Sequence, residues 1–323
     1  MNDRAQRYQV TAIVRGAMGR ALEWRLLTLF TATVLSTTAV SAFPAWRVLA
    51  GALDRSPHAK EIAQSFDLLA FADIGVAFFR SAAPVTGAMV VGTLLSAFSW
   101  PFLAGMAVGA ARGERPCSFV GWIEGGVVYY TRMLRIGLVA IVPLAIVVGA
   151  AALAFGGARH YGKRAILESQ AALGWRAALV FTLLVFVVVH ATIELGRAAF
   201  GVDDRLQSGW RAWLRGVELM GRHPLRALGT YLGPTLASYA IAVPLLIARL
   251  RLSGPSGIEL VMVFVLTQLA VASLGWGRAA RLLALTALSR CHSPSGVTSA
   301  DAPEVVPGDV HVVRSRGPIV SRP

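Results

Sequence analysis

Charged side chains are scarce in this chain of 323 residues. Only 15% of the residues are charged, with 31 Lys and Arg against 17 Asp and Glu. Soluble domains carry about 25% charged residues, so the composition argues against a water-soluble fold. A net charge of +14 suits nucleic-acid binding when it is clustered on a soluble surface. Here the basic residues separate apolar runs, which is typical of lipid contacts, and we expect no nucleic-acid partner.

Cysteines and catalytic motifs are equally sparse. Cys117 and Cys291 are the two cysteines, and they form neither a disulfide framework nor a zinc motif. The sequence contains no His-Glu-x-x-His and no Gly-x-Ser-x-Gly. A Gly-x-x-x-x-Gly-Lys string at 157–163 continues with arginine instead of Ser or Thr and follows no predicted strand, unlike a phosphate-binding loop. We therefore expect a non-enzymatic protein without a cofactor or a metal site.

Long apolar runs are abundant instead. Hydrophobic residues make up 55% of the chain and the mean hydropathy is +0.61. Six runs have about the length that crosses the hydrocarbon core of a bilayer. They cover 26–43, 81–111, 136–158, 177–193, 227–248 and 260–277, with a loop at 159–176. The sequence predicts an all-α polytopic membrane protein with six transmembrane helices.

The predicted transmembrane domain covers residues 1–290, and two regions differ from its spans. Residues 51–80 form the longest connection, with apolar stripes that predict a helical cap on the outer surface. Residues 291–323 are rich in Ser, Pro, Val, Gly and charge without periodicity, which predicts a disordered cytoplasmic tail.

Amphipathic segments precede every second span. The clearest is 210–228, where tryptophans and aliphatic residues share one helix face and arginines share the other. A helix of this kind lies at the headgroup boundary with its arginines near lipid phosphates. We predict headgroup contacts from Arg211, Arg215, Arg222 and Arg226, although ordinary topological anchoring requires the same residues. Similar segments cover 10–22 and 119–135.

The even-numbered spans have similar endings. Residues 196–199 and 277–280 both read Gly-Arg-Ala-Ala, and 109–112 read Gly-Ala-Ala-Arg. The endings are roughly 80 to 90 residues apart, enough for one amphipathic helix and two crossings. The sequence therefore predicts three hairpin repeats, each preceded by an amphipathic interfacial helix. Within the second span, small residues at four-residue spacing, including Gly105 and Gly109, predict a close packing seam.

These amphipathic segments and span endings resemble a broad group of bacterial six-span membrane proteins of unknown function. They also resemble the membrane domain fused to some glycerophosphodiester phosphodiesterases. The resemblance covers roughly residues 8–285, and it implies an architecture and no catalytic residues, since no phosphodiesterase domain accompanies the spans. With the N-terminus inside, about two thirds of the Lys and Arg residues face one side. We expect a multi-pass protein of the bacterial cytoplasmic (inner) membrane with both termini in the cytoplasm.

His190, Glu194 and Arg197 are the candidate substrate-binding residues. They share one face of the fourth span, and ionisable residues inside a membrane are functional candidates because burying them unpaired is costly. The pair His190 and Glu194 can relay protons, contact a substrate or supply two metal ligands. Alternatively, Glu194 pairs with Arg197 at the membrane boundary and His190 forms a hydrogen bond within the bundle.

Two functions fit these observations. The first is a protein that binds or moves a lipid or small solute between its hairpins, with membrane lipids as partners. The second is a non-catalytic accessory or scaffolding subunit of a membrane complex, whose partner protein the sequence does not identify. The small-residue seam and the missing catalytic motifs are compatible with both.

Overall fold

The computed structural model describes residues 3–54, 68–113, 118–165, 167–252 and 257–292, and the described chain is helical with no strand. In chain order, the helices are α1 (Asp3–Ala21), α2 (Trp24–Leu53), α4 (Leu68–Arg80), α5 (Ala82–Arg112), α6 (Phe119–Val139), α7 (Ile141–Arg164), α8 (Glu168–Phe200), α9 (Gly209–Arg222), α10 (Pro224–Arg251) and α11 (Gly257–Cys291). Six segments are long and apolar enough to cross a membrane: Trp24–Gly51, Ala82–Arg112, Phe119–Arg164, Glu168–Phe200, Pro224–Arg251 and Gly257–Cys291. The prediction of an all-helical chain with six helices long and apolar enough to span a membrane is confirmed for the described residues.

The helices extend beyond the apolar runs that predict them. Residues 159–176, expected as a loop, are helical through Arg164 and again from Glu168. Lys163 and Arg164 lie in the last turn of α7 and Glu168 in the first turn of α8, where each charge is favourable to the helix dipole. Hydropathy therefore located the apolar part of each helix and missed its polar ends. At about 1.5 Å per residue, α8 is about 50 Å long and exceeds the hydrocarbon core.

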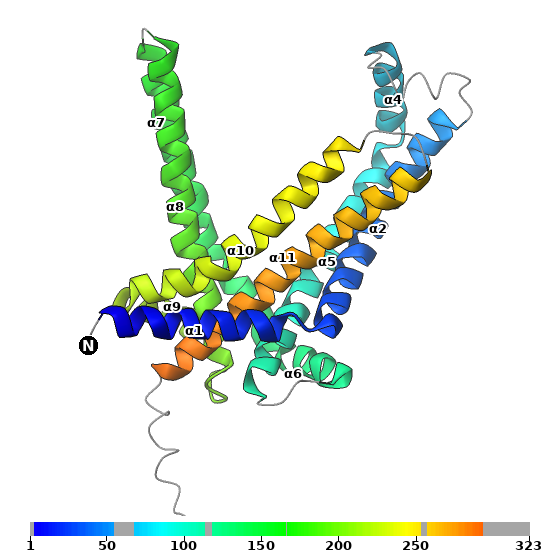
Figure 1. Ribbon diagram of the computed structural model, residues 1–323. Helices are drawn as coiled ribbons and strands as arrows, with labels where there is room; N and C mark the ends of the chain where they lie inside the picture. The colour runs from blue at the N-terminus through cyan, green and yellow to red at the C-terminus, as the bar shows by residue number, and fades with distance from the viewer. Residues whose placement is uncertain (1–2, 55–67, 114–117, 166, 253–256, 293–323) are drawn as a thin grey trace, which may run out of the picture.

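The long helices run from one end of the molecule, which we call the base, toward the other (Figure 1). α2 and α5, α7 and α8, and α10 and α11 pack along one another. α1 and α9 lie across the base, and α4 lies at the opposite end (Figure 1). α4 belongs to the predicted cap at 51–80, of which residues 55–67 lie outside the described residues. The predicted tail likewise lies outside them from residue 293 onward.

Side-chain burial is concentrated at the base. Met106, Ile136, Phe200 and Leu282 come from four different helices and are all fully buried there. Away from the base the apolar side chains are exposed, for example Leu153 at 80%. Apolar surface of this extent is typical of a membrane or protein contact, and it agrees with the six candidate spans.

Glycines allow the short helices at the base to approach the long ones closely. A Cβ atom on Gly109 of α5 would meet the Cα atom of Gly125 in α6 at 2.7 Å, and a Cβ atom on Gly105 would meet the carbonyl oxygen of Gly126 at 3.0 Å. The predicted packing seam in the second span is confirmed at these glycines. A Cβ atom on Gly216 of α9 would meet the backbone oxygen of Thr192 in α8 at 2.3 Å. Small residues thus seat α6 on α5 and α9 on α8.

Candidate functional site

A buried carboxylate lies at the centre of the most enclosed polar cluster. Glu194 of α8 has no exposed surface. Its Oε1 atom accepts a hydrogen bond from Arg197 Nη1 at 2.6 Å and lies 3.4 Å from Arg281 Nη2 and 3.8 Å from His190 Nε2. The three residues singled out in the sequence are therefore in contact. Their spacing of three and four residues along α8 places them on one face.

Helices α10 and α11 supply the other members of this cluster. Arg281 also donates from Nη1 to Thr235 Oγ1 at 3.1 Å, and its guanidinium lies over the ring of Tyr231, 4.9 Å from the centroid. The Tyr231 hydroxyl is 2.9 Å from His190 Nδ1. These partners are not predictable from local spacing because they come from other helices. The available signal was that Arg281 directly follows the second Gly-Arg-Ala-Ala ending.

The cluster contains more positive than negative charge. Arg278 lies with its guanidinium carbon 3.7 Å from the centroid of the Trp100 ring, and its charge acts on Glu194 together with those of Arg197 and Arg281. Arg278 forms no ion pair within the part of the chain that the structure describes. Three guanidinium groups therefore surround one carboxylate.

Several buried polar atoms of the cluster also have no hydrogen-bond partner among the described residues. They are Glu194 Oε2, Arg278 Nε and Arg281 Nε. Buried polar groups are almost always satisfied in folded proteins, and an unpaired buried charge is costly. We refer to Glu194, Arg197, Arg278 and Arg281 as the Glu194 cluster. A bound anion can satisfy the two arginine Nε donors, whereas Glu194 Oε2 requires a donor.

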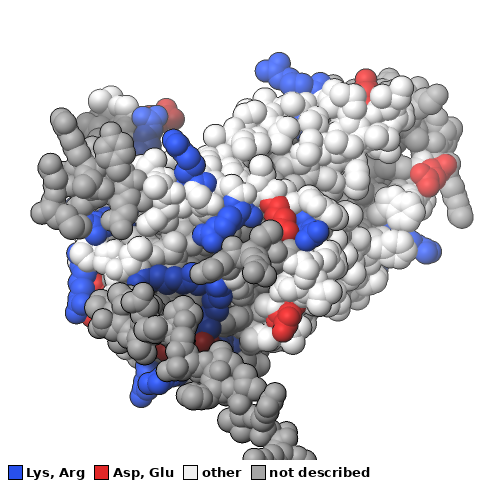
Figure 2. Space-filling model, turned by 60° about the horizontal axis from the view of Figure 1, so that its bottom comes forward, with Lys and Arg blue, Asp and Glu red and all other residues white. Residues whose placement is uncertain are grey.

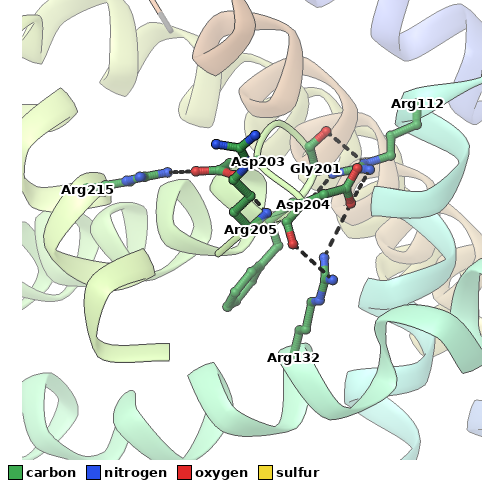
Figure 3. Close-up of polar contacts among 8 residues, drawn as sticks. Arg112, Arg132, Gly201, Asp203, Asp204, Arg205 and Arg215 are labelled. Atoms are coloured by element: carbon green, nitrogen blue, oxygen red, sulfur yellow. Dashed lines mark hydrogen bonds and ion pairs between the residues drawn. The ribbon is translucent and has the colours of Figure 1, made fainter. Parts of the chain in front are cut away.

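A second polar cluster is formed by the loop that follows α8 (Figure 3). Asp204 binds Arg112 of α5 and lies 3.6 Å from Arg132 of α6, while Asp203 accepts a hydrogen bond from Arg215 of α9 at 2.6 Å. The hydrogen bonds from Arg112 and Arg215 lower the pKa values of Asp204 and Asp203, respectively, below their ordinary range. The loop thereby ties three helices together at the base.

Backbone carbonyls complete this second cluster. Arg112 donates from Nε to the carbonyl of Gly201 at 3.1 Å and from Nη2 to that of Phe200 at 2.9 Å (Figure 3). Carbonyls at the end of a helix have no partner within that helix, and Arg112 satisfies those of α8. All three nitrogen atoms of the Arg112 guanidinium thus contact the loop or the end of α8 that precedes it. The signal in the sequence was two adjacent acidic residues directly after a span in an acid-poor chain.

The four arginines predicted to contact headgroups have different surroundings. Arg211 is exposed on α9. Arg215 binds Asp203, and Arg222 binds Glu218 at 2.6 Å. Arg226 Nη1 lies 3.3 Å from His292 Nε2. Headgroup contact by all four stays a prediction.

The geometry of the Glu194 cluster suits noncovalent recognition of a negative group. Among the described residues, no group of three or more His, Cys, Asp or Glu side chains is arranged to hold a metal ion. Guanidinium groups bind phosphates and carboxylates strongly through charge-assisted hydrogen bonds. Comparisons with models of protein families, with curated proteins and with solved structures each found no match.

Proposed function

We propose that the chain crosses a membrane as three hairpins, α2 with α5, α7 with α8, and α10 with α11, each preceded by an amphipathic interfacial helix. The packing at the base supports this. α6 packs on α5, α9 packs on α8, and α1 packs on α11, where Trp276 Nε1 donates to the carbonyl of Met18 at 3.0 Å. Each interfacial helix thus covers the second helix of one hairpin. Because α1, from the start of the chain, packs on α11 at its end, the three hairpins are linked in a cycle. This relation fits repeats around an axis near the membrane normal.

In this proposal, the base faces the cytoplasm of a bacterium and the spans lie in its inner membrane. Lys and Arg side chains gather on the base, which is turned toward the viewer in Figure 2, and much of the visible flank is uncharged. Basic residues are retained on the cytoplasmic side of membrane proteins. Both α1 and the end of α11 lie at this end (Figure 1), which supports two cytoplasmic termini.

The protein's proposed role is to bind an anionic lipid or small anionic solute at the Glu194 cluster, without covalent catalysis. The observation that carries this proposal is one buried carboxylate surrounded by three guanidinium groups, with Arg278 lacking an ion pair among the described residues. A bound anion supplies the missing negative charge. Because the cluster is largely withdrawn from water, each interaction with that anion is stronger than at an exposed surface.

Arg278 gives the sharpest test. We expect wild-type protein purified in mild detergent to retain a stoichiometric anionic molecule, identified by native mass spectrometry, and Arg278→Gln to lose it. No carboxylate pairs with Arg278 among the described residues, so this substitution leaves Glu194 with its two direct partners and should preserve folding. The matched control is Arg249→Gln, which removes an exposed arginine at the far end of α10.

Retention of the same molecule at the same occupancy by Arg278→Gln would contradict the proposal. So would wild-type protein that carries no anion after incubation with excess anionic lipid and with excess inorganic phosphate. A stoichiometric partner protein without any enriched anion would instead support the accessory-subunit function.

A further inference from the structure

An apolar groove runs along α5 and the end of α6 and reaches Arg197 of the Glu194 cluster. Its volume is about 290 Å³. The apolar side chains that line it include Leu94, Phe98, Pro101, Met133, Leu134 and Leu138. Phe98 and Leu138 are more than half exposed, so the groove opens sideways on the apolar flank. In a membrane this opening faces lipid.

Two arginines lie in or next to the lining of the groove. Arg197 is the charged residue among those that line the groove. Trp100 also lines the groove, and the Arg278 guanidinium stacks on its ring. Arg197 shares its charge with Glu194, whereas Arg278 is the guanidinium without an ion pair among the described residues. The apolar groove therefore leads toward Arg197 and Arg278, which together carry more positive charge than Glu194 balances.

We propose that this groove binds an anionic glycerophospholipid, with its phosphate at Arg197 and Arg278 and one acyl chain along the groove. This inference rests on the proposed function and names its ligand and its binding place. A water molecule takes about 30 Å³ in the liquid, so the groove holds about ten groups of that size, comparable with the methylenes of an acyl chain. Charge complementarity selects the anionic headgroup, and the apolar lining accommodates a chain that a free phosphate lacks.

Lipid binding in the groove can be tested by a substitution at Gly137. Gly137 lines the groove, and a Cβ atom added to it meets no atom within 4 Å. The Cβ atom of Gly137→Leu therefore meets no neighbouring atom, and we expect the rest of its side chain to occupy part of the groove. Gly149 in α7 is equally open and lies outside the groove, so Gly149→Leu is a control of the same chemistry. Leucine is also the better helix former, and both variants should fold.

The experiment uses delipidated full-length protein in detergent and measures lipid binding by native mass spectrometry. The probes are phosphatidylglycerol, phosphatidylcholine and inorganic phosphate. We expect wild-type protein and Gly149→Leu to bind one phosphatidylglycerol at least tenfold more tightly than phosphatidylcholine. Gly137→Leu should weaken phosphatidylglycerol binding at least tenfold, and Arg278→Gln should remove the preference for the anionic lipid.

The outcomes separate the two proposals. If Arg278→Gln loses phosphatidylglycerol but Gly137→Leu binds it as wild type does, the groove is wrong and the anion site stands. If both variants bind as wild type does, both proposals are wrong. If inorganic phosphate displaces the lipid from wild type at equal concentration, the acyl chain contributes nothing and the lipid assignment is wrong.

Discussion

Removing the negative charge of Glu194 should destabilise the bundle strongly. Glu194→Gln preserves the shape of the side chain but leaves Arg197 and Arg281 without the carboxylate that both contact. Breaking a buried ion pair by neutralising one partner costs about 3–5 kcal/mol, because the remaining charge stays buried without compensation. Here Glu194 has no exposed surface, so water cannot take its place.

Glu218 provides the matched control. Its carboxylate lies 2.6 Å from Arg222 Nη2 on the same kind of helical spacing, but both side chains are more than half exposed. An exposed pair of this type contributes about 0–1 kcal/mol. Glu194→Gln and Glu218→Gln therefore make the same chemical change to a carboxylate 2.6 Å from an arginine, and they differ in burial and in the number of charged partners.

Thermal unfolding of the detergent-solubilised protein measures the difference. At about 2 °C per kcal/mol for a large domain, we expect Glu194→Gln to lower the Tm by about 6 °C or more and Glu218→Gln by about 2 °C or less. Adding Arg197→Gln to Glu194→Gln should recover part of the loss, since it removes one uncompensated charge. Equal shifts for the two single variants, or a further loss in the double variant, would refute the reasoning.

Three further predictions concern the base. Gly216→Val should destabilise the protein by about 1–3 kcal/mol through overpacking. Gly221→Val should not, because no atom lies within 4 Å of an added Cβ there. Chemical or thermal unfolding of the two variants measures the difference. The lowered pKa of Asp203 means that its ion pair stabilises the folded state above the unfolded-state value of about 3.9, and this stabilisation is lost as pH falls through the lower folded value. The stability difference between wild type and Asp203→Asn should therefore be constant at neutral pH and shrink below about pH 4, in unfolding measured across pH. In a Cys117→Ser background, a membrane-impermeant maleimide should label the exposed Cys291 in inside-out vesicles and not in intact cells; the reverse pattern would contradict cytoplasmic termini.

Local sequence patterns predicted the six spans and the contact between His190, Glu194 and Arg197. Both follow from properties that a single helix determines, namely its apolar length and the spacing that places residues on one face. The ends of the helices were less predictable. Polar residues such as Lys163 and Glu168 are compatible with a loop and equally with a helix that extends beyond the hydrocarbon core.

The polar residues of α10 and α11 in the surroundings of Glu194 could not be predicted from local sequence patterns. Arg281 and Thr235 approach α8 only because α10 and α11 pack against it, and no periodicity along one helix encodes that contact. Asp203 and Asp204 were missed for the same reason, since their arginine partners come from α5, α6 and α9. Long-range pairing had to come from the three-dimensional structure.

The distribution of acidic residues favours the Glu194 cluster as the place where we propose that an anion binds. At the base, Asp203 and Asp204 compensate arginines of three neighbouring helices, and those pairs are at least partly exposed to water. The Glu194 cluster is largely buried and has one carboxylate for three guanidinium groups. A bilayer offers phosphates at the same depth as interfacial helices. Because Arg278 contacts Trp100, a lining residue of the groove, we expect its missing counter-charge to come from a membrane lipid.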